Sequence, residues 1–126
     1  METKSCGCSC SSSPTILFPC SGAADVGELS DRTARQLTRQ GVGKVFCLAG
    51  IGGGVSGIIE STRSAEKILV IDGCPLDCAK KTMEKGGFSS FKHVRITDIG
   101  FEKGHTEVSE TTVAQATSKC KALICS

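Results

Sequence analysis

The sequence predicts a single three-layer αβα domain of the α/β class, in which helices cover both faces of a mainly parallel sheet of four strands. Two observations predict this fold class. The chain has 126 residues, 39% of them hydrophobic and 22% charged, which is the size and composition of one globular domain. After residue 14, short apolar runs alternate four times with stretches of helical character, and repeated β-α units form parallel sheets. The expected arrangement is Rossmann-like or flavodoxin-like.

Each element is identified by its pattern and by its stop signals. The predicted strands are the apolar or alternating runs at 15–18, 44–48, 67–71 and 93–98. The predicted helices are 25–40, about 55–64, a segment that Pro75 opens and Gly86 closes, and 106 to about 124. We expect the strand order 2-1-3-4, which places a topological switch between the first and third strands.

The first 14 residues differ in composition from the rest of the chain. Residues 1–14 are a Ser- and Cys-rich polar tract, which we interpret as a flexible tail before a zinc-binding domain at 15–126. The tract lacks the apolar core of a signal peptide, so we expect a cytoplasmic protein. The longest mainly apolar stretch, 44–59, contains five glycines and is too short to span a membrane. The net charge of +2 comes without a basic stripe, so nucleic acid is not an expected partner.

The cysteines carry the strongest functional signal. A cytosolic chain with nine of them is suited to metal or thiol chemistry rather than to structural disulfides. Four follow predicted strand ends or open the helix after the third strand, and the carboxyl ends of parallel strands share one edge of the sheet. Four thiolates with a common focus match the tetrahedral sulfur ligation of zinc. The predicted metal ligands are Cys20, Cys47, Cys74 and Cys78.

The remaining cysteines and histidines are weaker candidates. Cys6, Cys8 and Cys10 form a dense thiol set in the tail, which either adds metal ligands or is only a thiol-rich disordered segment. Cys120 and Cys125 come late in the last helix, at the opposite edge of the sheet, and are excluded. His105 is either an extra ligand or a solvated loop residue, and Asp98 is either a support for the site or a turn residue. His93 begins the fourth predicted strand, at the opposite edge from the cysteines.

A glycine-rich segment offers a rival interpretation. Residues 52–57 match G-x-G-x-x-G after an apparent strand, and Asp72 follows at the position of a ribose-binding carboxylate. The alternatives are a small anion bound at a helix N-terminus, or a backbone that passes close to the metal. The candidate cofactor- or anion-binding residues are Gly50, Gly52, Gly53 and Gly54.

Several segments together resemble a known family. Asp72-Gly73-Cys74 is similar to the central motif of the DGC family, described as zinc-binding proteins of prokaryotes. The segments at 18–27, 47–53 and 74–78 resemble that family as well, so the likeness covers about residues 15–104. The resemblance implies chelation by the same four cysteines. It does not supply a reaction.

Three functions therefore stay open at the level of the sequence. The first is a zinc-binding protein for metal handling, sensing or structure, with an iron–sulfur cluster as the alternative occupant. The second is a cysteine-dependent redox or sulfur-transfer enzyme that uses Cys20 or Cys74. The third is a nucleotide-binding domain. A metal ion is the one partner that the sequence identifies.

Overall fold

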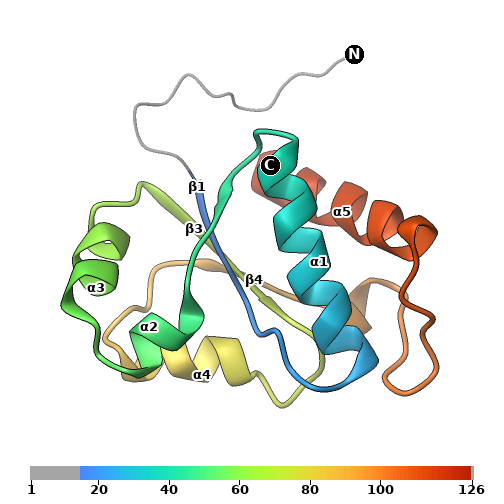
Figure 1. Cartoon of the computed structure of the whole chain (residues 1–126), viewed down its shortest axis with the longest axis horizontal. Coiled ribbons are helices and arrows are strands. Elements are labelled where there is room, and N and C mark those ends of the chain that lie inside the picture. Colours follow the sequence, from blue (N-terminus) through green and yellow to red (C-terminus); the bar gives the residue numbers. More distant parts are fainter. Residues whose placement is uncertain (1–14, 126) are drawn as a thin grey trace.

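Strands and helices alternate from residue 15 onward in the computed structural model, which describes residues 15–125 (Figure 1). The strands are β1 (Thr15–Pro19), β2 (Lys44–Val45), β3 (Lys67–Asp72) and β4 (Lys92–Arg95). The helices are α1 (Asp25–Arg39), α2 (Leu48–Gly52), α3 (Ser56–Arg63), α4 (Cys78–Lys85) and α5 (Glu110–Cys125), and a 3₁₀ helix, η2 (Ile96–Ile99), follows β4.

All four strands are parallel and lie in the order β2-β1-β3-β4, which confirms the predicted order. β1 and β3 form the centre and pair from Thr15 with Lys67 to Pro19 with Ile71. β2 lies on one side of β1, and β3 and β4 lie on the other. The direction in which the chain adds strands therefore reverses after β2, and this reversal is the topological switch. Ligands of open α/β sheets bind at such a switch, outside the carboxyl ends of the strands.

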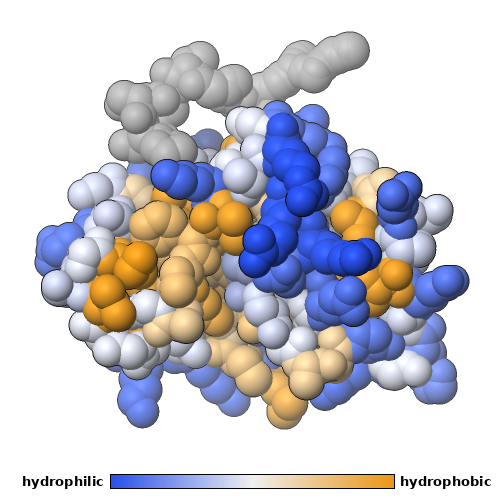
Figure 2. Space-filling model, viewed as in Figure 1, coloured by the Kyte–Doolittle hydropathy of each residue, from blue (hydrophilic) through white to orange (hydrophobic). Residues whose placement is uncertain are grey.

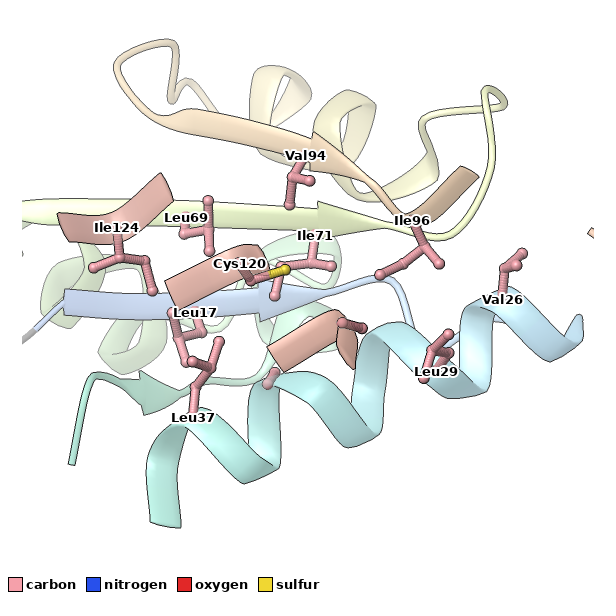
Figure 3. Close-up of a cluster of buried hydrophobic side chains, with 12 residues drawn as sticks. Leu17, Val26, Leu29, Leu37, Leu69, Ile71, Val94, Ile96, Cys120 and Ile124 are labelled. Atoms are coloured by element: carbon pink, nitrogen blue, oxygen red, sulfur yellow. The ribbon is translucent and has the colours of Figure 1, made fainter. Parts of the chain in front are cut away.

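Helices cover both faces of the sheet, each over its own apolar core. The larger core packs α1 and α5 on one face of β1 and β3, and Figure 3 shows Leu17, Leu69, Ile71 and Cys120 meeting there. The other core packs α2 and α4 against Phe18 and Val70, which point to the opposite face because side chains alternate along a strand. The predicted three-layer α/β class is therefore confirmed.

Four predicted boundaries were wrong. β2 ends at Val45 because the chain turns at Cys47 into α2, so the segment that begins at Gly50 is partly helix rather than turn. β4 ends at Arg95 and continues as η2. The last helix begins at Glu110, after a loop that hydrogen bonds hold to α1. Pro75 does not open α4, which starts three residues later.

The described residues include no helix whose length and apolar character would suit a transmembrane span.

Candidate metal centre at the carboxyl edge

Four cysteines lie just beyond the carboxyl ends of three neighbouring strands. Cys20 directly follows β1, Cys47 is the residue before α2, Cys74 comes two residues after β3, and Cys78 is the first residue of α4. The thiols of Cys20 and Cys74 are half-buried, whereas Cys47 and Cys78 are exposed. The topology thus brings all four to one edge of the sheet, which is the lower edge in Figure 1.

Two of these thiols share a cleft. Cys20 and Cys47 both line a cavity of about 750 Å³ between α1, β2 and α2. Its apolar wall includes Phe46, whose ring meets buried Phe18 edge to face at 6.0 Å between centroids. Figure 2 shows this apolar surface beside the hydrophilic ridge of α1. The Cys20 sulfur also lies 3.4 Å from the hydroxyl oxygen of Ser30.

The sulfurs have not closed into a tight cluster. Among residues 15–125, no three cysteine sulfurs lie within 4.8 Å of one another. Tetrahedral zinc with Zn–S bonds of about 2.3 Å needs sulfurs about 3.8 Å apart. The four-cysteine ligand set therefore stays a prediction. Thiolate donors suit zinc, but the four sulfurs would have to move closer to one another to bind it.

Asp72, the first residue of the central motif, caps a helix. Its two carboxylate oxygens accept hydrogen bonds from the backbone amides of Ala79 at 2.7 Å and Lys80 at 3.0 Å, in the first turn of α4. One of them also lies 2.9 Å from Nε2 of His93. Both oxygens are engaged and the residue is buried, so Asp72 is not presented to a ribose as the dinucleotide interpretation requires.

Gly73, the second residue of the motif, permits a close backbone contact. A Cβ at Gly73 would lie 2.8 Å from the backbone nitrogen of Gly27, in the first turn of α1. A Cβ at Gly27 would in turn meet the backbone of Gly22 at 2.6 Å. The loops after β1 and β3 can therefore pass against α1 only with glycine at these positions. This contact places Cys20 and Cys74 on neighbouring loops.

Asp77 and Arg95 fix the loop between Cys74 and Cys78. Asp77 adopts a left-handed backbone (φ 58°), and its amide donates to the carbonyl of Cys74. Arg95 of β4 donates to both carboxylate oxygens, at 2.7 and 2.8 Å. This bidentate contact holds the pKa of the Asp77 carboxyl below its usual range. The loop that separates the two thiols is thus anchored at both ends.

Asp72, Asp77 and His93 form a compact acidic cluster, with ligand atoms within 4.8 Å of one another. We interpret it as a support for the loop rather than as a cation site, because its oxygens already accept amide and guanidinium hydrogen bonds. The Arg95 cation would also repel a metal ion there. His93 lies near the start of β4, as predicted, but β4 is short, so the ring still reaches the Asp72 carboxylate, a contact that the sequence did not predict.

A second loop reaches the site from the other side. Asp25, the first residue of α1, accepts hydrogen bonds from the backbone amides of Gly104 and Thr106 at 2.9 and 3.0 Å. The loop so held brings Nζ of Lys103 to 3.5 Å from the Cys74 sulfur. His105 lies in the same loop, exposed, and Asp98 lies 3.4 Å from Arg95.

The glycine-rich segment has another role. Gly50 and Gly52 lie within α2, Gly53 ends it, and Gly54 has a positive φ of 71°. A Cβ at Gly50 would lie 2.8 Å from the side chain of Ile58, so this glycine lets α2 and α3 pack closely. No strand leads directly into these glycines within the described residues, as a dinucleotide turn requires.

The remaining cysteines lie away from the candidate metal centre or outside the described residues. Cys120 is fully buried in the larger core, which agrees with its exclusion from the site, and burial raises the pKa of its thiol to about 12. Cys125 is the last residue of α5. Cys6, Cys8 and Cys10 lie outside the described residues. Lys103 and Arg95 were not predicted, because contacts between distant loops leave no local signal in a sequence.

The comparisons with known proteins agree with the motif. The DGC domain matches residues 16–120. The protein named anaerobic and virulence modulator AnvM, from Pseudomonas aeruginosa, is 31% identical over 100 residues, which cover 79% of this chain and 76% of that protein. No solved structure matches the chain.

Proposed function

Since this chain belongs to the DGC family, we propose that it binds one zinc ion through Cys20, Cys47, Cys74 and Cys78 and serves in metal handling or sensing. Membership of the family fits a metal-binding role. The observation that carries the proposal is the position of these cysteines just beyond the carboxyl ends of β1, β2 and β3, at the topological switch. Four soft thiolate donors at one edge suit zinc.

The surroundings of the thiols favour a metal ion that can exchange with other ligands, rather than one with a purely structural role. Cys47 and Cys78 are exposed, so solvent and a competing chelator can reach two of the four donors. The two apolar cores lie on the faces of the sheet and include neither of these residues. The supports described above, Asp72 and Arg95, hold the Cys74–Cys78 loop without using a sulfur atom.

A charge argument favours the same assignment. Four thiolates around one zinc ion carry a net charge of −2, and a nearby cation stabilises such a centre. Lys103 supplies an ammonium group 3.5 Å from the Cys74 sulfur. Lys103 would thus partly neutralise the negative charge at the centre while leaving the coordination to sulfur.

The test is metal analysis of protein purified anaerobically without chelator. We expect about one equivalent of zinc and no visible absorbance. Cys74→Ser should lose most of the zinc. Cys120→Ala is the control: it leaves a cavity in the core and destabilises the fold, but should keep its zinc. Unchanged zinc in Cys74→Ser would refute the ligand set, and iron with sulfide would keep the ligands and change the occupant.

One observation favours a second function, a thiol-dependent redox or transfer enzyme. The contact between Lys103 and Cys74 also suits a nucleophilic thiolate. Alkylation separates the two: metal-bound thiolates resist iodoacetamide until a chelator is added, whereas an activated nucleophile reacts at once. Protein without metal and with a fast-reacting Cys74 would favour the enzyme.

A further inference from the structure

A second concave surface lies between α1 and α5. It is a groove of about 720 Å³, and no cysteine lines it. Asp31 and Arg35 line both this groove and the cleft of Cys20 and Cys47. The residues that line the groove are Asp31, Arg32, Arg35, Gln36, Arg39, Gln40, Glu110, Val113, Ala114, Thr117, Ser118 and Lys121.

The groove is basic. Four cationic side chains and two carboxylates line it, which gives the groove a net charge of +2. The whole chain also has a net charge of +2, so its excess of positive charge lies at this groove. Arg35 is paired with Asp31 at 2.8 Å and Arg32 with Glu28 at 3.4 Å. Arg39 and Lys121 have no carboxylate partner among residues 15–125. Figure 2 shows the hydrophilic ridge that α1 presents here.

The cations of α1 form a row. Arg32, Arg35 and Arg39 are three and four residues apart, which places them on one face of the helix at intervals of about 5–6 Å. From Asp31 to Gln40 the groove follows α1 for about 14 Å at a rise of about 1.5 Å per residue. That length accepts about four residues of an extended chain, or about two and a half turns of a helix.

The opposite wall of the groove is less polar. Val113 and Ala114 of α5 contribute aliphatic surface. Thr117 is 2% exposed, and its hydroxyl oxygen has no hydrogen-bond partner among the described residues. The groove therefore combines cations on one wall with aliphatic contact on the other.

We propose that the α1–α5 groove binds an acidic segment of a protein partner, with carboxylates against Arg39 and Lys121 and aliphatic side chains against Val113. The chemistry of the wall favours a protein over a nucleic acid. No aromatic side chain lines the groove for base stacking, whereas Val113 and Ala114 offer aliphatic contact that a segment of protein can use and a chain of phosphates cannot. An amphipathic segment in a groove with complementary charge is a recurrent mode of peptide recognition.

The test uses three fluorescein-labelled peptides of twelve residues that share four leucines and carry Glu, Gln or Lys at the other positions. Fluorescence anisotropy with the metal-loaded protein should show the Glu peptide binding at least tenfold tighter than the Gln peptide, and weakening as salt rises. The Lys peptide should not bind. The double variant Arg39→Gln, Lys121→Gln should weaken binding of the Glu peptide at least tenfold.

The matched control removes the same two charges elsewhere. Lys81 and Lys85 are exposed on α4 and do not line the groove, so Lys81→Gln with Lys85→Gln should leave binding within twofold. An equal loss in this control would show general charge attraction and overturn the proposal. So would tighter binding of a twelve-nucleotide oligothymidine, or no preference among the peptides. Because Arg39 and Lys121 do not line the thiol cleft, zinc content should be unchanged in every variant.

Discussion

At the scale of single residues, each residue of the Asp72-Gly73-Cys74 motif has a different structural role. Asp72 caps α4, Gly73 passes against the first turn of α1, and Cys74 presents a thiol beyond the strand. The motif therefore specifies where the loop goes as well as which ligand it carries. A change at the glycine tests this directly, since it alters no donor atom.

We expect Gly73→Ala to destabilise the fold by at least about 2 kcal/mol, because its Cβ would lie 2.8 Å from the backbone of α1, which cannot move aside as a side-chain tip can. Gly57→Ala is the matched control. Gly57 lies in α3 with open space around its Cβ position, so alanine should stabilise by about 0.5–1 kcal/mol. Urea unfolding measures both, and a near-neutral Gly73→Ala would contradict the close contact.

Residue types and strand ends were enough to predict where the thiols lie, because a cysteine after a parallel strand must fall at the carboxyl edge. They were not enough to predict the residues that support them. The role of Asp72 depends on where α4 begins, and Lys103 reaches Cys74 across 29 positions of sequence. Such partners follow from packing, which no local pattern records.

At the scale of elements, the loop from Gly100 to Ser109 is tied to α1 by a single carboxylate. Asp25 accepts the amides of Gly104 and Thr106, and these two bonds lower the pKa of its carboxyl. An ionised Asp25 therefore stabilises the folded state. Because the folded pKa is depressed, this contribution is fully present above the unfolded value of about 3.9 and is lost as the pH falls through the folded pKa.

We expect Asp25→Asn to lower the free energy of unfolding by about 1–2 kcal/mol at pH 7, since an amide has one acceptor oxygen for the three backbone amides that donate to this side chain. The gap between wild type and variant should shrink below about pH 3.9 and close at still lower pH. Urea midpoints at a series of pH values measure it. A gap that did not change with pH would contradict a role for the ionised carboxylate.

Elements with a clear apolar pattern were predictable, and the glycine-rich segment was not. α1 and β3 end within one residue of their predicted bounds, because an amphipathic face and a fully apolar run are strong signals. In the glycine segment the pattern was misleading. Ile51 is buried in the smaller core, and that burial outweighs the low helix propensity of three nearby glycines, so α2 forms where a turn was predicted.

At the scale of the whole molecule, two cores on opposite faces of one sheet share the central strands. β1 supplies Leu17 to one core and Phe18 to the other, so neither core can open without disturbing the strand that both use. The observed strand order is the one we expected, although the β-α alternation predicts parallel strands and does not by itself determine their order. The division of the helices between the faces required the structure, because it depends on which crossover covers which face.

Cys120 provides a probe of this coupling. Its thiol is fully buried among residues of β1, β3 and α1, as Figure 3 shows, and burial raises its pKa to about 12. Alkylation requires both exposure and a thiolate. Modification of Cys120 should therefore occur only when the domain unfolds, whereas Cys78 is exposed and, if it binds the proposed zinc ion, should react once a chelator is added.

We expect the alkylation rate of Cys120 to rise with urea along the same slope as global unfolding, and that of Cys78 to be nearly independent of urea in chelator-treated protein. Mass spectrometry of peptides after timed iodoacetamide pulses measures both in one sample. If Cys120 reacted with a clearly smaller urea slope, α5 would be detaching on its own. The larger core would then unfold in two steps rather than one.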